Sequence, residues 1–129
     1  MENKLNNIVS VVGDYNEIAT EINSEALVVV MINGLTVTKS ADKMNWADGL
    51  LTFTVVINNE TNEVYKNPVI SDILDTSLVT FEAGTVTIDG EVADVSKYTY
   101  DDATGKLTIN GNDVLASSTS TITFKVAKK

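Results

Sequence analysis

Hydrophobic and polar residues alternate most regularly between residues 50 and 59. The apolar positions there are Leu51, Phe53, Val55 and Ile57, and mostly polar residues separate them. A period of two is typical of a β-strand that has one face buried and the other in solvent. This stretch therefore predicts a central strand whose apolar face needs a second sheet to cover it.

Several later segments have the same short, β-branched character and are candidates for that second sheet. They lie at 35–39, 65–74, 78–81, 85–88, 97–100, 106–109 and 119–127. Turn residues separate them, and the Asp89-Gly90 pair is typical of a two-residue hairpin. Pro68, the only proline, is expected at the start of its strand or at a sheet edge, because it cannot donate a ladder hydrogen bond. About seven to nine such strands predict an all-β fold, an antiparallel β-sandwich with Greek-key connections.

The first 25 residues have a less regular pattern that admits two interpretations. A helical stripe is formed by Leu5, Ile8, Val12, Tyr15, Ala19 and Ile22, which are three or four residues apart. Gly13 and the β-branched cluster around it disfavour a helix, so a strand over 7–12, a turn at Gly13-Asp14 and a short helix is the other interpretation. In either form, we expect an appendage to the β domain.

Residues 26–32 are apolar on both faces, so a strand there has to be covered on both sides. One interpretation is a local hairpin at Asn33-Gly34, or a kinked first strand, within the domain. The other is that this segment and the arm before it add to the sheet of a neighbouring copy. The expected division is an N-terminal arm over 1–32 and a sandwich over 33–129. The expected subunit interface comprises Leu5, Ile8, Val12, Tyr15, Ile18, Ile22, Leu27, Val28, Val29, Val30, Met31 and Ile32.

Composition narrows the classes of function. The chain has 129 residues and a net charge of −9 with no arginine, which disfavours binding to nucleic acid or to an anionic membrane. It has no cysteine and no histidine, which excludes disulfides, zinc–thiolate sites and histidine-dependent nucleophiles. No apolar run is long enough to cross a membrane, and no signal peptide is recognisable. We therefore expect no cofactor, no metal and no membrane insertion.

From Gly34 onward, six segments follow one another in an order that is typical of one family. They are 35–42, 49–58, 67–74, 81–90, 100–107 and 119–126. In these segments the chain resembles the bacterial conserved-repeat domain, a family of unknown function common in surface-exposed and cell-wall proteins. The resemblance implies an immunoglobulin-like sandwich and a structural role in stalks, surface layers or fibres, and relatives occur among spore-appendage proteins. The chain differs from many relatives in holding a single copy and in lacking a visible export signal or wall anchor.

Some surface sandwich domains join a lysine to an asparagine through an isopeptide bond, with a buried carboxylate as proton shuttle. Lys39 has the strand parity of its apolar neighbours, so it is expected to point inward, where an unpaired ammonium is costly. Asn58 or Asn59 is the candidate acceptor and Asp72 the candidate acid. The alternative is that Lys39 lies where its strand leaves the core and its charge reaches water.

Other candidate sites have simpler explanations. The loops at 101–102 and 110–113 carry Asp and Asn oxygens that suit calcium, but turns use the same residues. Trp46, Tyr65, Tyr98 and Tyr100 are candidates for a sugar-stacking platform, or for packing at a sheet end. No two carboxylates stand out as an acid–base pair, so we do not expect an enzyme.

These patterns together predict a non-enzymatic structural subunit. We expect copies of the chain to assemble into an extracellular or spore-surface filament through the N-terminal arm. The alternative is a monomeric surface adhesion domain that binds a glycan or a protein.

Overall fold

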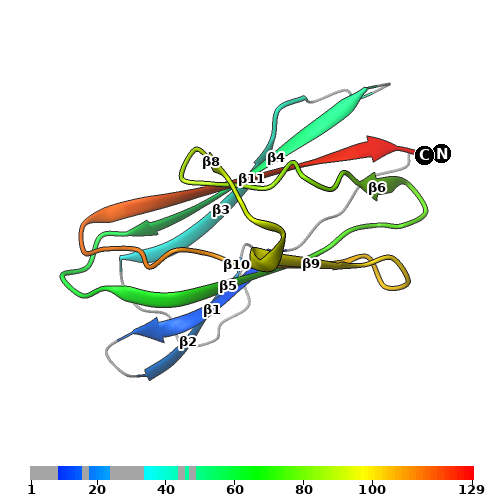
Figure 1. Cartoon of the computed structure of the whole chain (residues 1–129). Coiled ribbons are helices and arrows are strands. Elements are labelled where there is room, and N and C mark those ends of the chain that lie inside the picture. The colour runs from blue at the N-terminus through cyan, green and yellow to red at the C-terminus, as the bar shows by residue number, and fades with distance from the viewer. Residues whose placement is uncertain (1–8, 16–17, 24–33, 44–45, 47–48) are drawn as a thin grey trace.

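Two antiparallel sheets pack face to face (Figure 1). The computed structural model describes residues 9–15, 18–23, 34–43, 46 and 49–129. One sheet has five strands in the order β2 (Ile18–Asn23), β1 (Val9–Tyr15), β5 (Tyr65–Ile73), β10 (Lys106–Asn110) and β9 (Tyr98–Asp101). The other has the order β3 (Leu35–Ala41), β4 (Leu50–Asn59), β11 (Ser118–Lys128), β7 (Thr87–Ile88) and β8 (Glu91–Val92), and β6 (Val79–Phe81) also pairs with β11.

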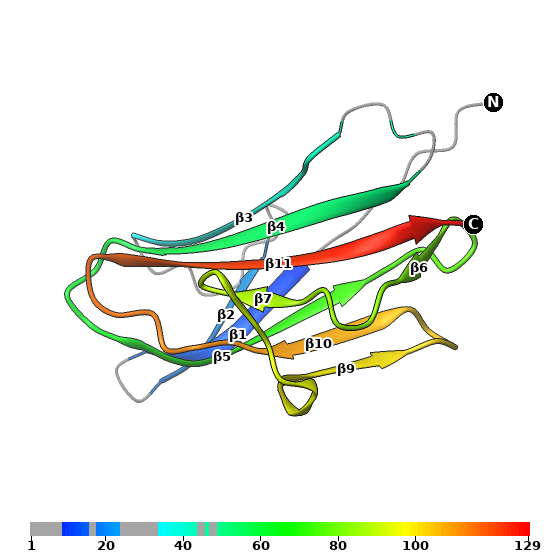
Figure 2. The same cartoon turned by 45° about the horizontal axis from the view of Figure 1, so that its top comes forward.

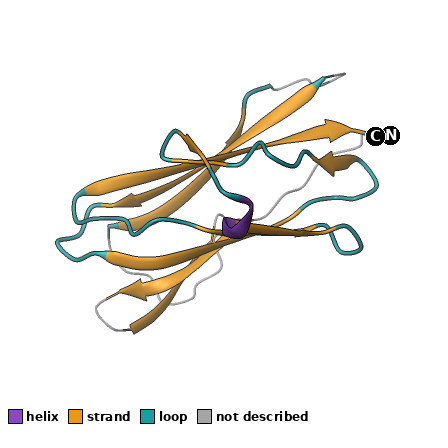
Figure 3. Cartoon of the chain, in the orientation of Figure 1, coloured by secondary structure: helices purple, strands orange, loops and turns teal. Residues whose placement is uncertain are grey.

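The predicted β-sandwich is confirmed, and its two layers lie one above the other in Figure 2. Figure 3 shows that the strands dominate, with one short 3₁₀-helix, η1 (Val95–Lys97), between β8 and β9. Among the described residues, no helix is long and apolar enough to cross a membrane. The Greek-key connections and the immunoglobulin-like topology stay predictions.

The core lies between the sheets and is formed by inward-facing residues of the long strands. Strand β4 alternates as predicted, with Leu51, Phe53, Val55 and Ile57 buried. It pairs with β11 along a continuous ladder from Asn59 opposite Ser118 to Leu50 opposite Ala127. Each fully buried side chain of this size contributes about 1.5–3 kcal/mol to stability. A slip of one residue in the ladder would turn all of them outward.

The N-terminal segment is part of the five-stranded sheet. Strand β1 pairs with β5 on one side and with β2 on the other. Val9 and Val11 are completely buried in the core. The helical stripe is therefore wrong for 9–15 and 18–23, because pairing with β5 and burial of alternate valines favour a strand. The strand interpretation holds for 9–12. The expected turn at Gly13-Asp14 is wrong, since β1 continues to Tyr15. The short helix expected after that turn is also wrong, because β2 lies there.

Residues 1–8 and 24–33 lie outside the described part of the chain. The predicted strand at 26–32 and the Asn33-Gly34 hairpin therefore stay predictions, as does the division of the chain at residue 32. The Asp89-Gly90 hairpin is confirmed: Ile88 pairs with Glu91, and φ is 52° at Asp89 and 87° at Gly90, as a type I′ turn requires.

Pro68 lies inside a central strand, so the expectation of a strand start or a sheet edge is wrong. The β1–β5 register shifts between Val12 and Asp14, which leaves Pro68 beside a β-bulge. On the other side of β5, the ladder to β10 ends at Val69, and the Pro68 carbonyl accepts a hydrogen bond from Gly111 N at 2.8 Å. The missing N–H of the proline therefore costs no ladder hydrogen bond.

The close approach of the β9–β10 turn to the end of β5 can be tested by replacing Gly105. Gly105 and Gly84 have φ of 78° and 79°, so an alanine at either carries about 1–2 kcal/mol of left-handed strain. A Cβ at Gly105 would also lie 2.1 Å from the Leu74 carbonyl oxygen, whereas one at Gly84 meets nothing within 4 Å. In urea denaturation, we expect Gly105→Ala to lower the free energy of unfolding by about 4 kcal/mol or more and Gly84→Ala by about 1–2 kcal/mol. Equal losses would contradict this packing.

Candidate functional site

A lysine and an aspartate form a buried ion pair between the two sheets. Lys39 Nζ lies 2.6 Å from Asp72 Oδ2, and 7% and 0% of their side chains are exposed. Lys39 belongs to β3, at one edge of the six-stranded sheet, and Asp72 to β5 of the other sheet. The two residues are therefore joined across the sandwich.

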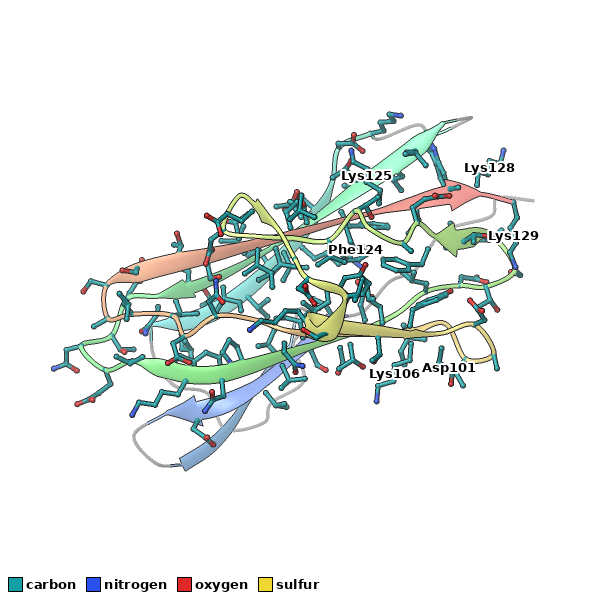
Figure 4. The ribbon with its side chains drawn as sticks, viewed as in Figure 1. Asp101, Lys106, Phe124, Lys125, Lys128 and Lys129 are labelled. Carbon is teal, nitrogen blue, oxygen red and sulfur yellow. The ribbon has the colours of Figure 1, made fainter. Side chains whose placement is uncertain are left out.

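Lys39 reaches this position because β3 alternates. Leu35 and Val37 point inward, and Lys39 continues their parity. Its Nζ lies 4.3 Å from the centre of the Phe53 ring and 5.8 Å from that of Phe124. Figure 4 labels Phe124 on β11, between the sheets, where it is completely buried. The faces of both rings attract the ammonium electrostatically. The inward orientation agrees with the sequence prediction, and little of the side chain reaches water.

Asp72 is held in the middle of the opposite sheet. On β5 it lies between Val9 of β1 and Leu107 of β10, and both neighbours are completely buried. Its strand parity is that of Ile70 and Leu74, which are core residues. A carboxylate in such surroundings depends on its partners, because burying an isolated charge costs several kcal/mol.

Burial lowers the pKa of the Lys39 ammonium, because the charged form loses its hydration there. The charge of Asp72 and its hydrogen bond raise the same pKa and offset part of this effect. The net direction is downward. Lys39 therefore reaches its neutral amine form more readily than an exposed lysine does.

An aromatic cluster extends from the ion pair toward the end of the five-stranded sheet. The rings of Phe53 and Phe124 are 5.4 Å apart, and those of Phe81 and Tyr100 are 5.0 Å apart. The rings of Phe81 and Tyr98 form a T-shaped pair with their centres 5.9 Å apart. Tyr98 and Tyr100 thus pack at a sheet end. The sequence pattern indicated that Phe53 points inward, but it gave no sign that these phenylalanines lie close to Lys39.

The four aromatics considered as a sugar platform do not share one exposed surface. Tyr65 is completely buried, and its hydroxyl donates a hydrogen bond to the Val11 carbonyl at 3.3 Å. Trp46 packs partly against the core and donates from Nε1 to the Gly49 carbonyl at 3.2 Å. The packing alternative therefore describes these residues better.

The candidate acceptor Asn58 is not brought to Lys39. Lys39 lies opposite Val55, whereas Asn58 has the opposite parity on β4 and so faces away from the core. Asn59 points inward, but it is four residues along the strand from Val55. Its Nδ2 donates to the Glu63 and Val114 carbonyls at 2.7 and 3.0 Å. Asn59 therefore stabilises the turn after β4, and the predicted trio of Lys39, Asn58 and Asp72 is reduced to Lys39 and Asp72.

Few of the predicted interface residues can be placed. Val12 lies on β1 and is 41% exposed. Tyr15 is the last residue of β1, and Ile18 and Ile22 belong to β2. The remainder lie outside the described residues: Leu5, Ile8, Leu27, Val28, Val29, Val30, Met31 and Ile32.

The acidic side chains of both loops accept hydrogen bonds from backbone N–H groups. Asp101 Oδ1 accepts a hydrogen bond from Ala103 N at 2.9 Å, and Asp113 Oδ1 accepts one from Asn67 N at 2.8 Å. Figure 4 shows Asp101 and Lys106 at the β9–β10 turn, where they are register partners. Within the described ranges, no group of three or more acidic residues gathers as a metal site would require.

Comparisons with protein-family models, with curated proteins and with solved structures found no match for the chain. The resemblance to the conserved-repeat domain therefore stays a prediction.

Removing Lys39 tests the importance of the buried pair. Lys39→Met would leave Asp72 as a buried charge without its ammonium, so we expect the free energy of unfolding to fall by about 3–5 kcal/mol. Lys66→Met is the matched control, because Lys66 is exposed on the strand that carries Asp72, and we expect a change within about 0.5 kcal/mol. Urea denaturation of both variants measures the difference. A loss of less than about 1 kcal/mol for Lys39→Met would show that the pair is not buried as described.

The different roles of Asn58 and Asn59 can be tested by isosteric replacements. An aspartate at 59 cannot donate to the Glu63 and Val114 carbonyls, so we expect Asn59→Asp to cost about 3 kcal/mol or more. Asn58→Asp, on the outward face, should change stability by about 0.5 kcal/mol or less. Thermal unfolding of the two variants gives the comparison, and a reversed order would put Asn58 back into the core site.

Proposed function

We propose that this chain is a non-enzymatic structural subunit that assembles with copies of itself into a filament or appendage on the surface of a cell or spore. The subunits are joined by exchange of the N-terminal strands. The proposal includes the immunoglobulin-like topology that the family resemblance implies.

The position of β1 carries this proposal. It is the first described strand of the chain, it lies next to the central strand β5, and it buries Val9 and Val11 completely. Together with β2 it forms a hairpin at one edge of the five-stranded sheet. A copy without this hairpin in place would expose β5 and part of the core, so the same hairpin from a neighbour restores both.

Exchange of such a hairpin changes the free energy little, because the hairpin makes the same contacts within one copy and between two copies. Residues 24–33 connect β2 to Gly34 and β3. Ten residues of any chain span at most about 33–36 Å, which limits how far an exchanged hairpin could lie from its own sandwich. If each copy gives its hairpin to the next, the contact does not close on itself, and the result is a fibre.

A monomeric module that binds a glycan or a protein is the alternative. No exposed aromatic surface in the described part of the chain favours it, since Tyr65 is buried and Tyr98 and Tyr100 pack on Phe81. Such a module would keep β1 on its own β5.

Cysteine cross-linking distinguishes exchange from a closed monomer, and the chain has no cysteine of its own. Ser10 and Ser71 are register partners on β1 and β5, so Ser10→Cys/Ser71→Cys forms a disulfide wherever these strands pair. Under oxidising conditions, exchange gives a ladder of covalent oligomers on a non-reducing gel, because the bond joins different copies. Negative-stain electron microscopy of the unmodified chain should show filaments.

Thr54→Cys/Thr123→Cys is the matched control, because Thr54 and Thr123 pair on β4 and β11, outside the exchanged hairpin. Its disulfide should stay within one chain. Covalent monomers from both variants, with dispersed particles in the microscope, would rule out the filament and favour the binding module.

A further inference from the structure

We propose that the Lys39–Asp72 pair is a site of self-modification, where the amine and the carboxyl condense to an intramolecular amide that links β3 to β5. In this pair, oppositely charged side chains from the two sheets meet in a salt bridge. The amide would convert a contact between the sheets into a covalent bond. This inference does not depend on filament formation.

The geometry brings the reacting groups together before any reaction. Lys39 Nζ lies 2.6 Å from Asp72 Oδ2, so the carboxyl carbon is within a short movement of the nitrogen. The side chains come from strands in different sheets, each fixed by its own ladder. Holding two groups in this way corresponds to effective concentrations of about 10⁵–10⁸ M in well-oriented reactions.

The groups around the pair are mostly apolar, which favours the neutral amine form of Lys39. Val9 and Leu107 flank Asp72 in its sheet, and Phe53 and Phe124 lie against Lys39. Because a buried ion pair carries a desolvation penalty, this site reduces the cost of transferring one proton from the ammonium to the carboxylate, which gives a free amine and a carboxylic acid. The downward pKa of Lys39 is consistent with this transfer.

The condensation balances without any other reactant. The Nζ lone pair attacks Asp72 Cγ and forms the N–C bond, and the C–O bond to one carboxyl oxygen breaks. That oxygen leaves as water with the acid proton and one proton from the amine. No oxidant or reductant is required, and the pair has no net charge before or after. Exclusion of bulk water from the site opposes the reverse hydrolysis.

This chemistry differs from the bond expected from the sequence. An asparagine acceptor at position 58 would release ammonia with Asp72 as shuttle, but Asn58 faces away from Lys39. In the proposed reaction Asp72 is itself the acceptor and water is the leaving group. The two reactions therefore differ in the mass they remove from the chain.

Intact-mass spectrometry of the purified full chain under denaturing conditions tests the inference. We expect the chain to be lighter than its sequence by about 18 Da, the mass of one water. Trypsin should fail to cleave after Lys39 and should yield a branched peptide that joins the segments containing Lys39 and Asp72. The full sequence mass, with normal cleavage after Lys39, would overturn the proposal.

Variants exclude other sources of water loss, such as a cyclic imide at an Asp-Gly pair. Lys39→Met and Asp72→Leu should each show their full sequence mass, whether or not they fold. Asp72→Asn should lose about 17 Da instead, because the leaving group becomes ammonia. A loss of about 18 Da that persists in Lys39→Met would place the modification elsewhere and refute the amide.

Discussion

The register of the β4–β11 ladder decides which side chains lie between the sheets. Phe53 and Phe124 are register partners, and both point into the core. Because the period of a strand is two, the same register turns the threonines of both strands outward. This single alignment places the rings of Phe53 and Phe124 beside Lys39, and it also produces the apolar face opposite β5.

In such a core, a buried polar side chain needs a hydrogen-bonding or charged partner. Asn59 meets two carbonyls through its amide, and Ser120 donates to Asp89 at 2.8 Å, so each buried side chain stabilises a turn or a hairpin. Lys39 and Asp72 are different because they are joined to each other across the sandwich rather than to a nearby turn. We expect a polar contact of this kind to specify how β3 and β5 face one another more closely than nonpolar packing does.

Local pattern was sufficient for much of the sandwich and for both charged residues of the site, Lys39 and Asp72. The alternation of β4 and the inward parity of Lys39 were both readable, because each depends on neighbours within one strand. Asn58 and Asn59 were both named as candidate acceptors without regard to parity, and the structure shows that Asn58 faces away from the core. One of the two interpretations of the N-terminal segment contained the strand at 9–12, but the extent of β1, the existence of β2 and the position of Pro68 were not readable. They depend on the pairing of β1 with β5 across about fifty or more residues. No stretch of local sequence records that pairing, and it is this pairing that displaced the helical stripe.

The distance in sequence between β1 and β5 has a consequence for synthesis. On a ribosome, Val9 emerges long before Asp72, its register partner. Until β5 appears, the β1–β2 hairpin has no sheet to join, and a two-stranded ribbon alone is barely stable in water. Closure of the sheet is therefore a late event with a high contact order, and such events are slow. If hairpins exchange between copies as proposed, this interval is also the time in which neighbouring nascent chains on a polysome could exchange them.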